Sequence, residues 1–104
     1  MDRVGFCMRL KPGCADEYRR RHDALWPDLR ESLKRAGIAD YSIFLAPDGI
    51  TLFAVLKSAD AAARAALPED PAMRRWWAFM ADIMETNPDR SPAVEMLAEV
   101  FYLP

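Results

Sequence analysis

Large apolar side chains alternate with small or polar ones in several stretches of the chain, a pattern typical of β-strands that bury one face. Every second residue from 4 to 10 is large and apolar, and Pro12-Gly13 ends this pattern. Pro47-Asp48-Gly49 is a turn signal between two further stretches. The predicted strands are residues 4–10, 41–46, 50–57 and 95–103.

A long helix is predicted over residues 15–36, with Gly37 as its C-terminal stop. Tyr18, His22 and Trp26 follow one another at four-residue spacing, so their side chains should share one helix face. Leu29 and Leu33 continue this line, which makes it the buried side of the helix.

Pro27 lies inside the predicted helix and cannot donate a backbone hydrogen bond. Its ring also crowds the carbonyl of Asp23, so the helix should kink or restart near Trp26. The interruption falls beside His22 and should leave the Asp23 carbonyl free.

Two more helices are predicted in the second half of the chain. Residues 60–67 are alanine-rich, and Pro71 suits the first turn of the next helix. Residues 87–92 read as an irregular loop. The last helix carries an apolar stripe at helical spacing, formed by Met73, Trp76, Trp77, Met80, Ile83 and Met84.

The order strand, helix, strand, strand, helix, strand predicts an α+β, ferredoxin-like βαββαβ fold with a four-stranded antiparallel sheet. Helices then cover one face of the sheet, and the other face should be polar in a monomer. However, Ile43 and Phe44 are both apolar, and residues 52–56 are apolar without a break. We therefore predict a homodimer that packs sheet against sheet.

The 104 residues suffice for a single domain, 1–104, with one core. Fourteen basic and sixteen acidic side chains leave a net charge of −2, which gives no general electrostatic reason to bind nucleic acid or an anionic membrane. We expect a cytoplasmic protein, because no signal region or membrane-span pattern is visible. Cys7 and Cys14 are interpreted as free thiols, with a disulfide as the less favoured alternative.

Several kinds of site lack their sequence patterns. One histidine and two cysteines six residues apart do not form a zinc motif. The four glycines are scattered and form no phosphate-binding loop, and no serine has the surroundings of a nucleophile. We therefore expect no metal and no cofactor. Residues Arg19-Arg20-Arg21 are interpreted as a solvated helix face, with one arginine reaching a carboxylate.

His22 is the only histidine in the chain. Imidazole titrates near pH 6.5 and can give or take a proton near neutrality. From spacing alone, two interpretations stay open: a catalytic group, or a core histidine bonded to the carbonyl that Pro27 frees.

Trp76 and Trp77 are adjacent, so their side chains diverge by about 100° on a helix. One ring can be core while the other lines a pocket and stacks on a sugar; two core residues are the plainer alternative. Tyr18 and Tyr41 carry hydroxyls that need partners if buried. Together with His22, these residues suggest acid–base chemistry on a small polyol.

Nearly the whole chain resembles the L-rhamnose mutarotase family, most weakly over residues 59–72. The resemblance rests on the blocks Tyr18-x-x-x-His22-x-x-x-Trp26-Pro27, Asp40-Tyr41-Ser42-Ile43-Phe44-Leu45, Arg75-Trp76-Trp77, Met84-x-x-Asn87-Pro88-Asp89 and Glu99-Val100-Phe101-Tyr102-Leu103. It implies a dimeric α/β-barrel type of ferredoxin-like fold.

The resemblance also implies an isomerase that interconverts the α and β anomers of L-rhamnose. It implies His22 as the proton donor, and Tyr18, Tyr41, Trp76 and Trp77 as substrate-binding residues. The base at the anomeric hydroxyl and the preference among 6-deoxy sugars stay open. Two alternatives remain: a monooxygenase of the same fold, and a non-catalytic dimeric sugar-binding module.

Overall fold

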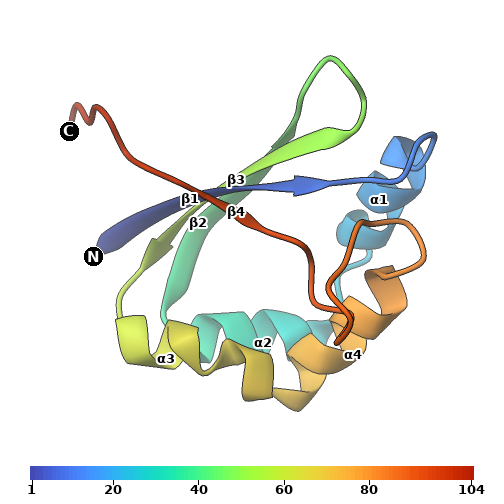
Figure 1. Ribbon diagram of the computed structural model, residues 1–104. Coiled ribbons are helices and arrows are strands. Elements are labelled where there is room, and N and C mark those ends of the chain that lie inside the picture. Colours follow the sequence, from blue (N-terminus) through green and yellow to red (C-terminus); the bar gives the residue numbers. More distant parts are fainter.

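The computed structural model describes all residues from Met1 to Pro104. Four strands and five helical segments follow one another along the chain (Figure 1). In chain order they are β1 (Asp2–Arg9), α1 (Ala15–Asp23), α2 (Pro27–Arg35), β2 (Ile38–Leu45), β3 (Thr51–Ser58), α3 (Ala61–Ala65), the 3₁₀ segment η1 (Leu67–Glu69), α4 (Pro71–Met80) and β4 (Glu95–Leu97).

The strands form one antiparallel sheet in the order β2-β3-β1-β4, which is the ferredoxin-like order. The helices lie together on one side of this sheet, and the N- and C-termini emerge at the same end of it (Figure 1). The predicted fold class is therefore confirmed.

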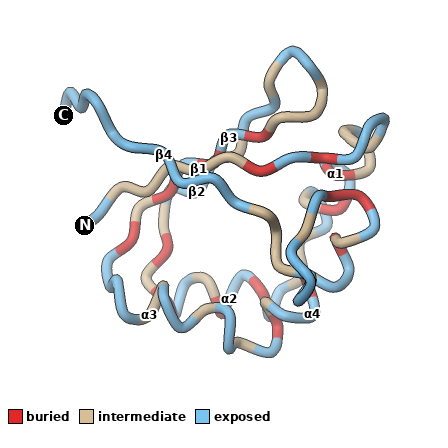
Figure 2. Tube along the Cα trace, viewed as in Figure 1, coloured by how far each residue is buried: buried red, intermediate tan, exposed pale blue.

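The core lies between the sheet and the helices (Figure 2). Alternate residues of β3 are buried because successive side chains of a strand point to opposite faces. The main apolar cluster joins β1, β3, α1, α2, α4 and the segment after α4; its buried members are Met8, Leu10, Tyr18, Leu29, Leu52, Ala54, Trp76, Met80, Ile83 and Met84.

The predicted long helix is two helices in the structure. The first ends at Asp23, and Pro27 occupies the first turn of the second, where its missing N–H is not needed. No backbone N–H donates to the Asp23 carbonyl, as expected. Gly37 follows the second helix with φ of 78°, a conformation that favours glycine.

The predicted last strand is too long. Only Glu95–Leu97 pair with β1, and the chain beyond Leu97 extends past the sheet as an exposed arm (Figure 2). Arg3 holds this arm through an ion pair with Glu99 at 2.9 Å and by lying over the ring of Tyr102. Side-chain contacts therefore replace the ladder hydrogen bonds that the apolar sequence of the arm led us to expect.

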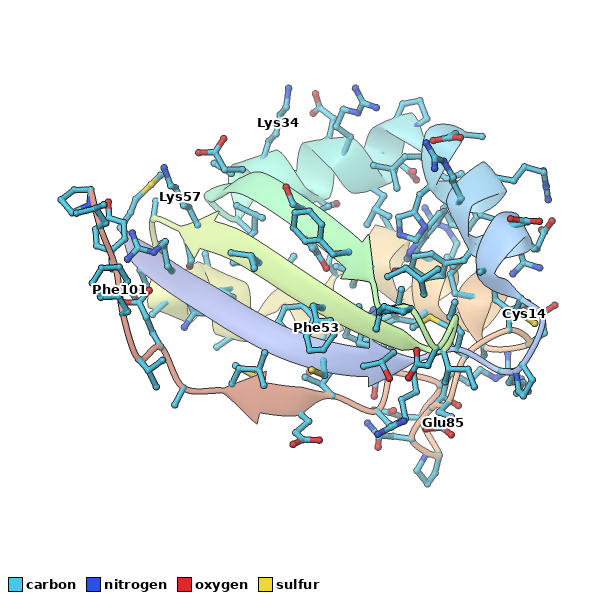
Figure 3. All side chains as sticks on the ribbon, turned by 90° about the horizontal axis from the view of Figure 1, so that it is seen from above. Cys14, Lys34, Phe53, Lys57, Glu85 and Phe101 are labelled. Atoms are coloured by element: carbon cyan, nitrogen blue, oxygen red, sulfur yellow. The ribbon has the colours of Figure 1, made fainter.

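The face of the sheet opposite the helices is uncovered, with Phe53 near its centre (Figure 3). The pairing register places apolar residues side by side across it. Phe44 lies opposite Phe53, which lies opposite Cys7; in the next row Val55 lies opposite Gly5, which lies opposite Leu97. Phe44 is 62% exposed and Phe53 is 40% exposed.

None of the helices combines the length and the apolar character that a membrane span requires.

Candidate active site

Two aromatic side chains of α1 and one from the interruption between α1 and α2 lie in one cluster. The Tyr18 and His22 rings, one turn apart on α1, have centroids 4.2 Å apart. The rings of His22 and Trp26 each contact Trp76 edge to face, at 5.3 Å and 5.1 Å. The predicted common direction of Tyr18, His22 and Trp26 therefore results in one aromatic cluster, built around a tryptophan from α4.

His22 is half-buried, and its Nδ1 lies 3.0 Å from the carbonyl oxygen of Tyr18. A carbonyl oxygen only accepts hydrogen bonds, so the Nδ1 atom must carry the proton. In the neutral imidazole the other nitrogen, Nε2, then has a free lone pair. This geometry presents Nε2 as a proton acceptor.

Burial lowers the pKa of His22 below its ordinary value, because the charged imidazolium loses solvation. The bond to the Tyr18 carbonyl and the nearby charge of Asp23 act in the opposite direction and are outweighed. His22 is therefore neutral at pH 7, with the Nε2 lone pair available.

Tyr18 and Tyr41 supply hydroxyl groups that stay protonated. Burial raises the pKa of the Tyr18 phenol well above its usual range, and the nearby Tyr41 raises it further. Burial raises the pKa of Tyr41 to about 12, although 39% of its surface remains accessible. Part of the residue is open to solvent, but the surrounding protein limits the solvation that the phenolate would need. At neutral pH both phenols can donate a hydrogen bond, and neither is a base.

A β-bulge orients Tyr41. Asp40 and Tyr41 of β2 together oppose the single residue Leu56 of β3, since Ala39 pairs with Lys57 and Ser42 with Val55. Asp40 has φ of 48°, a left-handed conformation that non-glycine residues seldom adopt. Because of the extra residue, Tyr41 lies on the helix-covered side, where its ring centroid is 6.5 Å from that of Phe6.

The two adjacent tryptophans have different surroundings, as their predicted divergence of about 100° on the helix implies. Trp76 is 6% exposed and is a member of the core, while Trp77 is half-buried and packs at the margin of that core. Trp76 has the direct contact with His22; no aromatic contact joins Trp77 to His22. Of the five predicted residues, the structure brings Tyr18, His22 and Trp76 into one cluster, places Tyr41 near Tyr18, and leaves Trp77 at the edge.

Sequence reasoning missed two residues that support this cluster. Phe79 contacts Trp26 and Trp76, with ring centroids 5.3 Å and 5.7 Å away. Arg21 belongs to the run interpreted from sequence as a solvated face with one arginine reaching a carboxylate. It does reach carboxylates, but it is buried, and it bonds Glu17, Asp82 and the Phe79 carbonyl. The four-residue spacing of Glu17 and Arg21 was a visible signal for half of this network.

Two surface hollows lie away from the cluster. One, of about 390 Å³, is lined mainly by β1 and the segment 85–95, including Cys7, Arg9 and Glu85. The other, of about 340 Å³, lies between the turns that follow β1 and β2. Neither is lined by any of the five predicted site residues. No group of three or more histidine, cysteine, aspartate or glutamate residues is arranged to hold a metal ion.

Comparison with known proteins points to one family. A model of the L-rhamnose mutarotase family matches residues 3–103. An L-rhamnose mutarotase of Acidiphilium cryptum is 55% identical over 104 residues, all of both chains. Another, of Burkholderia ambifaria, is 53% identical over 103 residues, 99% of each chain.

Solved structures agree with these relatives. The crystal structure of an L-rhamnose mutarotase from Formosa agariphila matches with a TM-score of 0.92 and 42% identity, covering 100% of both chains. A crystal structure of an antibiotic biosynthesis monooxygenase matches with a TM-score of 0.63 over 94% of this chain and 97% of that one. Its identity is 14%, so this likeness concerns the fold alone.

Proposed function

Because the chain belongs to the L-rhamnose mutarotase family, we propose that it is an isomerase that interconverts the α and β anomers of L-rhamnose, with residues 1–104 as one catalytic domain. The observation that carries this proposal is the state of His22. A neutral imidazole, with Nδ1 engaged by a carbonyl and Nε2 free, lies in an aromatic cluster with Tyr18, and both Tyr18 and the nearby Tyr41 stay protonated.

Anomer exchange needs one proton to move between two oxygens on the same carbon. The anomeric hydroxyl loses its proton, its C–O bond becomes a carbonyl, and the bond from C1 to the ring oxygen breaks as that oxygen is protonated. We propose that Nε2 of His22 takes the first proton and that the resulting imidazolium donates it to the ring oxygen. Reclosure on the other face of the aldehyde reverses both transfers and restores the neutral imidazole. His22 would thus act as both base and proton donor.

The neighbouring residues suit a 6-deoxy sugar. Trp77, half-buried at the margin of the core, would pack its ring against the apolar C–H surface and methyl group of the sugar, and Trp76 would add the small part of its surface that stays accessible. The hydroxyls of Tyr18 and Tyr41 would bond its hydroxyl groups, because both phenols remain protonated at neutral pH.

We further propose a homodimer formed through the uncovered face of the sheet. Large apolar side chains exposed over neighbouring strands are typical of a protein interface. Phe44, Phe53, Val55 and Leu97 occupy adjacent register positions on this face. The exposed arm, with Val100 94% and Phe101 77% exposed, continues the apolar surface beyond β4 (Figure 3). A cytoplasmic location is proposed as well, because Cys7 and Cys14 are both unpaired.

Saturation-transfer NMR of anomer exchange tests the proposed activity directly. Adding catalytic amounts of the protein to L-rhamnose should increase exchange between the two anomeric proton signals. Related 6-deoxy sugars in the same assay would rank the substrates. Binding of L-rhamnose without faster exchange would overturn the enzymatic assignment and favour a sugar-binding module.

A further inference from the structure

Arg21 is buried, with only 9% of the residue exposed. Its guanidinium donates hydrogen bonds to three groups. Its Nε donates to Glu17 at 2.6 Å. Its Nη1 and Nη2 atoms donate to the two carboxylate oxygens of Asp82, at 2.8 Å and 3.2 Å. The Nη1 atom also donates to the backbone carbonyl of Phe79 at 2.9 Å. Such a bidentate arrangement fixes both the position and the plane of the guanidinium.

These bonds join two helices that carry the proposed site. Glu17 lies on α1 with Arg21, while Phe79 is in the last turn of α4 and Asp82 follows that helix. Carbonyls in the last turn of a helix lack intrahelical partners, and positive charge is favourable there. Arg21 therefore caps α4 from α1 and fixes one helix relative to the other.

The same side chain reaches the aromatic cluster in two ways. The guanidinium carbon lies 4.5 Å from the ring centroid of Phe79, and this ring packs against Trp76. Arg21 also directly precedes His22 on α1, so its anchoring sets the rotation of the helix about its axis and with it the direction of the His22 side chain.

We propose that Arg21 is a positioning residue for the anomer exchange: its fork of hydrogen bonds to Asp82 and the Phe79 carbonyl sets the placement of His22 against Trp76. This role rests on the proposed mutarotase function. The bonded partners explain why a positive charge alone would not suffice. Lysine has a point charge and no planar fork, so it cannot satisfy Glu17, both oxygens of Asp82 and the carbonyl together.

The test compares Arg21→Lys with Arg20→Lys. Arg20 is the matched control because it bonds the same carboxylate, Glu17, but is exposed and has no hydrogen bond or ion pair with α4. Arg21→Lys should lower kcat for anomer exchange by about ten- to a hundredfold, as expected for a misplaced catalytic group, and change KM by no more than about threefold. Arg20→Lys should leave both constants unchanged.

An independent readout comes from the protein itself, since His22 is its only histidine. The imidazole NMR signals of Arg21→Lys should titrate at a different pH from those of the wild type. Those of Arg20→Lys should titrate at the same pH as in the wild type. A folded Arg21→Lys variant with unchanged kcat and unchanged His22 titration overturns the proposal.

If that variant does not fold, Asp82→Asn decides by the same two measurements, because it keeps Arg21 but weakens the fork. If the wild type shows no anomer exchange, the proposed function fails, and the titration alone decides the role of Arg21.

Discussion

The Nδ1 atom of His22 lies 3.0 Å from the carbonyl oxygen of Tyr18, one turn earlier on the same helix. This contact fixes the tautomer of the only imidazole in the protein, because the carbonyl can only accept. Of the two alternatives left open by the spacing, the core histidine was expected to bond the carbonyl that Pro27 frees, that of Asp23. The bond goes to the Tyr18 carbonyl instead, so this acceptor was predicted wrongly. Nδ1 is thus satisfied within the protein, and the proposed catalytic role rests on Nε2, which has no hydrogen-bond partner there.

Replacing His22 with Gln should lower the rate of anomer exchange by about 10²–10⁴-fold, the usual contribution of a positioned acid or base. Glutamine can keep a hydrogen bond to the Tyr18 carbonyl but cannot exchange protons near neutrality. Saturation-transfer NMR measures the rate, and thermal unfolding checks that the fold is intact. A folded variant with wild-type exchange would show that His22 takes no part in the chemistry.

The activity should decrease on acidification. Because burial lowers the pKa of His22, Nε2 stays unprotonated to below pH 6.5, and the rate should be constant above that pH and fall below the lowered pKa. The titratable groups beside His22 are Tyr18 and Asp23 on α1, and Tyr41 on β2 lies near Tyr18. Both tyrosines stay neutral throughout this range. The measurement is kcat/KM between pH 4.5 and 8, with His22→Gln as the control that lacks the inflection. A rate that rises towards acid would mean that the imidazolium is the active form.

The same lowered pKa predicts how stability depends on pH. Between the lowered pKa of folded His22 and the value of about 6.5 in the unfolded chain, the unfolded state binds more protons, so acid favours unfolding. The contribution of His22 to the free energy of unfolding is therefore complete above pH 6.5 and is lost as the pH falls through the lowered pKa. Urea unfolding at several pH values should show a steeper loss in the wild type than in His22→Gln. Parallel curves for the two proteins would contradict this linkage.

Local pattern predicted much of the scaffold. Alternation of period two located β1 and the β2–β3 hairpin, and Pro27 correctly marked the restart between α1 and α2. The predicted end of β4 was wrong, since pairing with β1 stops at Leu97. Apolar composition alone cannot distinguish a strand from an extended arm that has no neighbouring strand to pair with.

The contacts of the site were harder to predict, because they join residues far apart in sequence. Trp76 meets His22 across two helices, and Asp82 meets Arg21 across 61 positions, neither of which has a periodic signal. The bulge at Asp40 was hidden as well. From Tyr41 onward the alternation is regular and shows no bulge. In a regular strand, residues that face the same side are an even number of positions apart, but Ile38 and Ile43 both face the core and are five positions apart. The extra residue between them is the bulge.

That bulge yields a prediction about Tyr41. Asp40→Val should destabilise the protein by about 1–2 kcal/mol, because a β-branched residue is strained at φ of 48°. It should also raise KM for the sugar, since relaxation of the bulge would turn Tyr41 away from the helix-covered side. Asp40→Gly is the matched control: both variants lose the exposed ion pair to Lys57, but glycine adopts this conformation without strain. Urea unfolding and exchange kinetics provide the two readouts. Equal stability of the two variants would show that the left-handed backbone carries no strain.

A single charged residue on the uncovered sheet face tests whether this face forms the proposed dimer interface. Val55 is 43% exposed at the centre of this face, between Ser42 on β2 and Gly5 on β1, and Gly5 lies opposite Leu97 of β4. In a symmetric dimer a substitution there enters the interface twice, so Val55→Asp would bury two unpaired carboxylates. We expect the wild type to sediment as a dimer at micromolar concentration and Val55→Asp as a folded monomer.

Lys34→Asp is the matched control for this measurement, because Lys34 is exposed on α2, away from the uncovered face (Figure 3). It introduces the same aspartate and should remain dimeric. Sedimentation equilibrium distinguishes the cases, and circular dichroism confirms that each variant is folded. A wild type that sediments as a monomer would contradict the proposed dimer. A dimeric Val55→Asp would instead show that the two copies associate through another surface, for which the apolar residues Val100 to Leu103 of the exposed arm are the next test site.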